Sequence, residues 1–163
     1  MNSASEVIFF FEPRAVAVVG ANRQPSKIGS EILNNLIAAG FAGPIYPIHP
    51  GGGQIDGRKA YPRVIDVPDP VDLAVVVVPA AHVAGVVDDC VAKGVKAIVV
   101  ISAGFAETGA AGRALEAELV EKVRVAGVRM VGPNCMGLLN ADPAVRLNAT
   151  FSPVYPPSGR VAM

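Results

Sequence analysis

A loop near the N-terminus combines residue types that bind phosphate groups in proteins. It follows an apolar run at residues 16–19 and precedes a segment of helical periodicity. A strand, a glycine turn and a helix N-terminus together present backbone N–H groups and a positive dipole end to an anion. The candidate binding residues of this loop are Gly20, Asn22, Arg23, Ser26 and Lys27. The alternative interpretation is that Ser26 only caps the helix, while Arg23 and Lys27 are solvated.

The spacing of this loop argues against a dinucleotide. The fingerprint G-x-G-x-x-G is absent, because the next glycine after Gly20 is Gly29. Dinucleotide-binding domains place an acidic residue at the end of the second strand to hold the ribose. Here that strand ends in His49 and Pro50, and no carboxylate follows until Asp56. NAD is therefore disfavoured, and an NAD-dependent oxidoreductase stays open only as an alternative.

Further loops leave the predicted strands at the same edge of the sheet. Ligands of parallel sheets bind beyond the carboxyl ends of the strands, so these loops are candidate binding segments. Their residues are Val78 and Pro79 after the third strand, Ser102, Ala103, Gly104 and Phe105 after the fourth, and Asn134 and Cys135 after the fifth. Small residues in these turns let a ligand approach the backbone.

Cys135 has a side chain that could act as a nucleophile. A catalytic thiol needs a neighbouring base or another means of lowering its pKa, and the two histidines, His49 and His82, belong to other loops. We interpret Cys135 as a small buried residue beside a ligand, with nucleophilic catalysis as the alternative. His82 is predicted to be a solvated residue in the first turn of a helix. The sequence has no cysteine and histidine cluster that predicts a metal site.

Strands and helices alternate along the chain. Strands are predicted at residues 16–19, 45–48, 73–78, 95–101 and 128–131, and helices at 27–39, 81–93 and 110–126. Continuous β-branched strands need cover on both faces, and a glycine follows each helix where a left-handed C-cap is favoured. A loop from Pro50 to Gly57, extended by a turn of helix at most, replaces one crossover helix. The predicted fold is α/β, a Rossmann-like, doubly wound and mainly parallel sheet.

Composition excludes several classes of protein. The 163 residues are 52% hydrophobic and 17% charged, with a formal net charge of zero, which argues against disorder and against a nucleic-acid partner. No apolar run reaches the length of about 18 residues that a membrane span requires, so no membrane partner is expected. The two cysteines lack paired spacing, which indicates the reducing cytoplasm as the location.

The C-terminal residues predict that the chain is part of a longer protein. After a segment rich in proline, serine and glycine, residues 160–163 resemble the start of a new strand. We expect one domain at residues 1–155, then a linker and the first strand of a following domain at 156–163. The alternative is a complete small protein that ends in an edge strand.

Taken together, the loops resemble those of a known family. The matching segments are Phe10–Ala21, Pro25–Gly29, Ile45–Pro50, Val71–Val75 with Val78–Ala80, Ser102–Glu107 and Val131–Gly137. They resemble the CoA-binding domain of NDP-forming acyl-CoA synthetases, which is also found in the α subunit of succinyl-CoA synthetase. The resemblance extends from Phe9 to Met163, and the order of its motifs makes it more specific than any single loop.

The resemblance implies that the ligand is coenzyme A or an acyl-CoA. The first loop, through Gly29, would hold the CoA phosphates, and Val78 and Pro79 would line the nucleotide or the pantetheine. Residues 102–105 would follow the pantetheine arm, and residues 134–135 would lie near its thiol.

One segment departs from the family pattern at the nucleotide end. Where relatives commonly carry Asn-Pro-Lys after the second strand, this chain has His49, Pro50 and Gly51. His49 and Pro50 are retained as candidate binding residues, but a lysine that could contact the nucleotide is missing. Arg58 and Lys59, a few residues later, are candidate substitutes.

The resemblance also implies the reaction of the parent protein. In this family an acyl phosphate forms, its phosphoryl group passes through a histidine of the next domain to a nucleoside diphosphate, and CoA takes the acyl group. That histidine and the ATP-grasp domain or subunit that uses ATP or ADP would lie outside this chain, so no catalytic residue is expected here. The alternatives are a CoA-binding regulatory domain of a protein lysine acetyltransferase and a stand-alone CoA-binding module.

Overall fold

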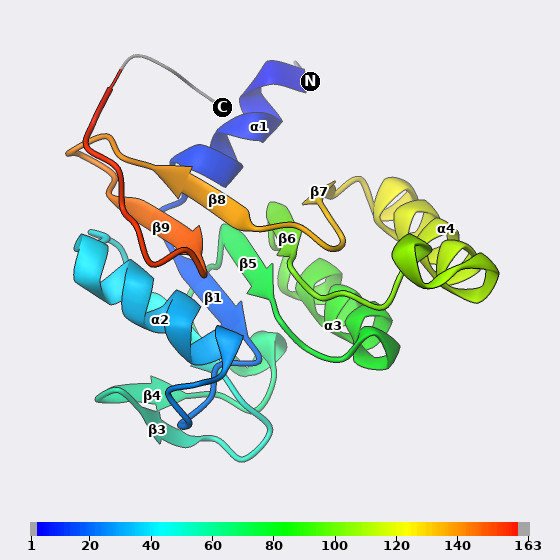
Figure 1. Ribbon diagram of the computed structural model, residues 1–163, viewed down its shortest axis with the longest axis horizontal. Coiled ribbons are helices and arrows are strands. Elements are labelled where there is room, and N and C mark those ends of the chain that lie inside the picture. The colour runs from blue at the N-terminus through cyan, green and yellow to red at the C-terminus, as the bar shows by residue number, and fades with distance from the viewer. Residues whose placement is uncertain (1–2, 160–163) are drawn as a thin grey trace.

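The predicted apolar strands pair into a central parallel sheet (Figure 1). The computed structural model describes residues 3–159, with side chains from residue 7 onward. The strands are β1 (Val16–Val19), β2 (Ile45–Ile48), β5 (Leu73–Val76), β6 (Ala97–Val100) and β7 (Arg129–Val131). Their order is β2-β1-β5-β6-β7, and each neighbouring pair is parallel. The expected Rossmann-like architecture is confirmed.

Helices cover both faces of this sheet. α2 (Ile28–Ala39) packs on one face, and α3 (Ala80–Lys93) and α4 (Ala110–Ala126) pack on the other. Alternate strand residues serve the two layers: Val16 and Val18 join the core beneath α2, whereas Ala17 and Val19 join the core beneath α3. Because both faces of each strand are buried, the strands are continuous apolar runs in the sequence.

The boundaries of these elements differ slightly from the expected ones. The helices end as predicted, because Gly40, Gly94 and Gly127 adopt the left-handed conformation. β5 ends at Val76 instead of Val78. The reason is that the N–H of Val78 donates to the Ser102 hydroxyl at 3.0 Å instead of to a neighbouring strand.

Several elements were not predicted. α1 (Ser3–Phe11) precedes the first strand, and the expected loop after β2 contains the antiparallel strands β3 (Gly53–Ile55) and β4 (Arg58–Ala60). The 3-10 turn η1 (Val64–Asp66), after β4, is the single turn of helix that was allowed for in this connection, whereas η2 (Ala106–Thr108), after β6, was not predicted. The proline-bearing segment after β7 contains a second hairpin of β8 (Gly137–Asn140) and β9 (Leu147–Thr150).

The β8–β9 hairpin is part of the core. Leu147 and Ala149 of β9 are fully buried in the cluster beneath α2, and the Asn35 amide of α2 donates to the carbonyls of Thr150 and Ser152 at 2.8 and 2.9 Å. The folded unit therefore includes residues up to Thr150. The strand predicted at residues 160–163 lies outside the described residues. Among the described helices, none is long and apolar enough to cross a membrane.

Asp72 joins the amino ends of the central strands. Its carboxylate, with a side chain only 3% exposed, accepts from the Arg14 backbone N–H at 3.0 Å and from Arg14 Nε at 2.8 Å. Its backbone carbonyl accepts from the N–H groups of Lys96 and Ala97. The hydrogen bonds from Arg14 hold the pKa of the Asp72 carboxyl below its usual value.

We predict that Asp72→Asn lowers the free energy of unfolding by about 1–3 kcal/mol at neutral pH, because it leaves buried hydrogen bonds unmade. Urea denaturation measures this difference, with Glu118→Gln on the exposed face of α4 as a control. A lowered folded-state pKa stabilises the protein above the unfolded-state pKa of about 3.9, and this stabilisation is lost as pH falls through the folded-state value. The difference should therefore shrink below about pH 4. A difference that persists there would contradict the ionic role of Asp72.

Candidate functional site

The candidate site lies where the sheet changes winding direction. The chain leaves β1 toward α2 on one face, and it leaves the adjacent β5 toward α3 on the other face (Figure 1). Connections that diverge in this way open a crevice at the carboxyl ends of the two strands. The loops after β1 and β5 therefore form the floor of the site.

Glycines set how closely these two loops approach. Gly20 has φ +96°, and a Cβ at this position would lie 2.1 Å from the Val77 carbonyl oxygen. A Cβ on Gly29, in the first turn of α2, would lie 2.0 Å from the Gly20 carbonyl oxygen. A side chain cannot be accommodated at either position without moving backbone, so the strand ends and α2 are in direct contact.

The first loop is held by polar contacts of its own. Asn22 Oδ1 accepts from the Gln24 N–H at 2.9 Å, and Ser30 Oγ lies 2.6 Å from the Asn22 carbonyl oxygen. The alternative interpretation of Ser26 as the N-cap is wrong, because Lys27 occupies the N-cap position and makes no capping bond with its side chain. Ser26 and Lys27 are both exposed.

Arg23 turns toward the β3–β4 hairpin. Its Nε donates to the Gln54 carbonyl at 3.2 Å, and its Nη2 donates to the Gly52 carbonyl. Arg23 therefore ties the first loop to the segment that follows β2.

The other predicted loops lie in a row along the same edge. The buried Ser102 hydroxyl accepts from the Val78 N–H, and the Ser102 carbonyl accepts from the Asn134 N–H at 3.0 Å. These bonds join the loops after β5, β6 and β7. Phe105 is 1% exposed and packs in the core beneath α3, so its side chain fills space between the layers.

A carboxylate shapes the turn after β6. Glu107 accepts from the N–H of Gly104 at 2.5 Å and from the N–H of Phe105 at 3.2 Å. These bonds lower the pKa of Glu107. Ala103 is exposed at the same turn, next to the buried Ser102.

Cys135 has no neighbouring base in the described structure. Its Sγ lies 3.4 Å from the Val100 carbonyl oxygen, and the residue is half-buried. Burial raises the pKa of the Cys135 thiol. This environment disfavours the thiolate that a nucleophile requires. Asn134, the residue before it, has a positive φ of 55°.

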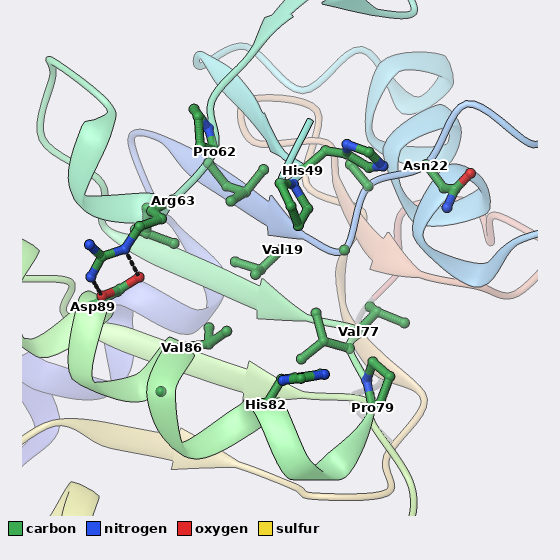
Figure 2. A pocket seen from close by; sticks show the side chains of 17 residues that line it. Val19, Asn22, His49, Pro62, Arg63, Val77, Pro79, His82, Val86 and Asp89 are labelled. Atoms are coloured by element: carbon green, nitrogen blue, oxygen red, sulfur yellow. Dashed lines mark hydrogen bonds and ion pairs between the residues drawn. The ribbon is translucent and has the colours of Figure 1, made fainter. Parts of the chain in front are cut away.

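A cavity of about 620 Å³ occupies the crevice (Figure 2). Its lining includes the predicted residues Gly20, Asn22, His49, Pro50, Val78 and Pro79. The other predicted residues do not line it: Arg23, Ser26, Lys27, Ser102, Ala103, Gly104, Phe105, Asn134 and Cys135. Arg58 and Lys59 also lie outside the lining, and the Lys59 ammonium sits 4.9 Å from the centroid of the Tyr61 ring.

Two segments that line this cavity are not among the binding residues predicted from the sequence. Pro62, Arg63 and Val64 line it from the segment after β4, and His82, Gly85, Val86 and Asp89 line it from α3. Figure 2 shows His49 and His82 on opposite sides of the cavity. The i, i+3, i+4 and i+7 spacing of the α3 residues places them on one helix face, which is a signal that the sequence does contain.

Charge in the cavity is balanced. Arg63 Nε donates to Asp89 Oδ2 at 2.9 Å, and this ion pair forms part of the lining (Figure 2). The remaining lining is mainly valine, proline and isoleucine. Within residues 3–159, no group of three or more His, Cys, Asp or Glu side chains could hold a metal ion. The cavity suits an organic ligand with an apolar face and a few polar groups.

Comparison with known proteins gives consistent matches. The signature of the CoA binding domain matches residues 14–141. An ADP-forming acetate–CoA ligase I of Archaeoglobus fulgidus is 47% identical over 93% of this chain, and the match covers 22% of the relative. The α subunit of the Pyrococcus furiosus ADP-forming acetate–CoA ligase I is 46% identical over 94% of this chain and 34% of the relative. The chain thus spans about a fifth to a third of these relatives.

Solved structures share the fold. A dinucleotide-forming acetyl-coenzyme A synthetase 1 of Ca. Korarchaeum cryptofilum, in complex with phosphate and ADP, superposes with a TM-score of 0.84 at 52% identity, over 90% of this chain and 31% of that one. A conserved hypothetical protein of Pyrococcus furiosus superposes with a TM-score of 0.58 at 29% identity, over 72% of this chain and 90% of that one.

The environment of the two cysteines predicts low thiol reactivity. At pH 7.5, iodoacetamide should alkylate Cys135 about tenfold more slowly than a free cysteine peptide, because its pKa is raised. Cys90 is fully buried with a pKa raised to about 12, so it should be labelled only after unfolding. Mass spectrometry follows both sites, with Cys135→Ser to assign the signal. Alkylation of Cys135 faster than the free peptide would instead indicate an activated nucleophile.

Proposed function

The chain belongs to the CoA-binding domain family, and we propose that its cavity at the β1–β5 crevice holds the nucleotide end of coenzyme A. The main support for this proposal is the position of the cavity. It lies where the sheet changes winding direction, between the loops after β1, β2 and β5. Its apolar lining suits an adenine ring, and the polar first loop beside it suits phosphates.

The remaining predicted residues take roles along the same edge in this proposal. Backbone N–H groups of the first loop, with Asn22, bind the CoA phosphates, and Lys27 at the start of α2 adds positive charge. The pantetheine arm follows residues 102–105, and its thiol lies near residues 134–135. The hydrogen bonds that join these loops in a row support this path.

We propose that the parent protein is an ADP-forming acyl-CoA ligase. In the proposed organisation, residues 1–155 form the CoA-binding domain, and residues 156–163 lead to a following domain. The histidine that carries the phosphoryl group, and the ATP-grasp domain or subunit, then belong to the rest of the protein. The A. fulgidus and P. furiosus relatives, which extend well beyond the matched region, support this organisation.

A second candidate is a stand-alone CoA-binding module. It is favoured by the P. furiosus structure of which 90% is covered by the match, since that chain consists almost wholly of this fold. Both candidate functions place CoA in the same cavity of this chain, so both predict that the chain binds CoA.

Calorimetric titration of the chain with CoA, dephospho-CoA and NAD tests the proposed ligand. We expect saturable heat with CoA and none with NAD, because the first loop lacks the dinucleotide spacing and β2 ends without an acid. Binding of NAD without binding of CoA would refute the proposal. Comparison of CoA with dephospho-CoA reports whether the 3′-phosphate contributes to affinity.

A substitution that fills the cavity tests its location. Gly85 lines the cavity from α3, and a Cβ added there meets no described atom within 4 Å. Gly85→Leu should therefore fold at least as well as the wild type, since leucine favours helix, and weaken CoA binding about tenfold or more by occupying the site. Ala92→Leu, on an exposed part of the same helix, is the matched control. Equal CoA affinity in both variants would show that CoA binds outside this cavity.

A further inference from the structure

The Arg23 side chain donates hydrogen bonds to the protein's own backbone. Its guanidinium donates through Nε to the Gln54 carbonyl and through Nη2 to the Gly52 carbonyl, across a sequence separation of about thirty residues. Gly52 is buried, so without Arg23 its carbonyl would lose a charge-assisted hydrogen bond in a partly desolvated place. Two acceptors held by one planar fork fix both the position and the tilt of the hairpin.

The turn that Arg23 holds is the turn that orients His49. The Gly52 N–H donates to the His49 carbonyl at 2.8 Å, and the Gly51 N–H donates to His49 Nδ1 at 3.0 Å. Because Nδ1 accepts a hydrogen bond, the ring proton of the neutral imidazole resides on Nε2. Arg23 thus acts through Gly52 on a histidine that lines the cavity.

Because this turn consists of glycines, its conformation depends on the contacts that Arg23 makes with it. Gly52 and Gly53 have φ values of +52° and +82°, and a Cβ on Gly53 would lie 3.0 Å from Arg23 Nη2. A run of three glycines has a large conformational entropy when it is not held, so contacts from outside the turn must select its conformation. Arg23 and the His49 ring supply those contacts.

We propose that Arg23 is a positioning residue for the ligand site: it clamps the glycine turn at residues 51–53 and thereby holds His49, as an Nε2–H donor, in the wall of the cavity. In this proposal Arg23 acts on the ligand site by ordering the turn, not by contacting the ligand. The effect on CoA affinity rests on the proposed function, whereas the clamp itself is a property of the protein without ligand.

The test compares Arg23→Lys and Arg23→Ala with Lys27→Ala, a neighbouring exposed cation for which no contact with the hairpin is found among the described residues. Because the proposed function places Lys27 near the CoA phosphates, Lys27→Ala is the control for amide exchange and for the His49 tautomer, not for the Kd. Lysine keeps the charge but loses the two-donor fork. We expect both Arg23 variants to raise the Kd for CoA about tenfold, and the amides of Gly51 and Gly52 to exchange with solvent about tenfold faster in the ligand-free chain. Nitrogen-15 spectra of His49 should show one tautomer in the wild type and Lys27→Ala, and a mixture in the Arg23 variants.

Two outcomes overturn the proposal. If Arg23→Lys keeps wild-type affinity, amide exchange and tautomer, the charge alone matters and Arg23 is not a clamp. If the effect of Arg23→Ala on the Kd fades between about 0.05 and 0.5 M NaCl, Arg23 contacts the phosphates directly, because such contacts are screened by salt. If the wild type fails to bind CoA, the proposed function fails, and the exchange and tautomer measurements still decide the clamp.

Discussion

The contact between the ends of β1 and β5 is the constraint on which the rest of the site depends. A Cβ at Gly20 would lie 2.1 Å from the Val77 carbonyl oxygen, and one at Gly29 would lie 2.0 Å from the Gly20 carbonyl oxygen. Only glycine permits this approach, which brings two oppositely directed connections and the start of α2 to one point. Every other part of the cavity is arranged around that point.

The cavity has two walls above this floor, and different interactions stabilise them. The wall on α3 is rigid, because its inner residues Val83, Val87 and Cys90 are fully buried against the sheet. The wall after β2 contains His49 and Pro50, and the glycine turn that follows them is fixed by polar contacts to Arg23 and His49. The ligand site thus combines one wall fixed by packing with one fixed by hydrogen bonds, and the second is the more open to adjustment.

The sequence was sufficient to predict the layers and the lining residues His49 and Pro50, but not the lining from Pro62–Val64 and α3. β-branched runs such as Leu73–Val76 and the glycines at the helix ends are local signals, so the sheet and its helices could be predicted. The β3–β4 and β8–β9 hairpins have short strands whose pairing depends on distant contacts, such as Asn35 with Thr150, and no local pattern encodes these. His82 is exposed in the first turn of α3, as predicted, and the prediction lacked only that this face of α3 lines the cavity.

A crystal structure of the chain with bound CoA should show the nucleotide end in the crevice, with His49 and the loop after β1 on one side and His82 of α3 on the other. An empty crevice at saturating CoA, with the nucleotide bound on another face of the molecule, would contradict this placement of the ligand.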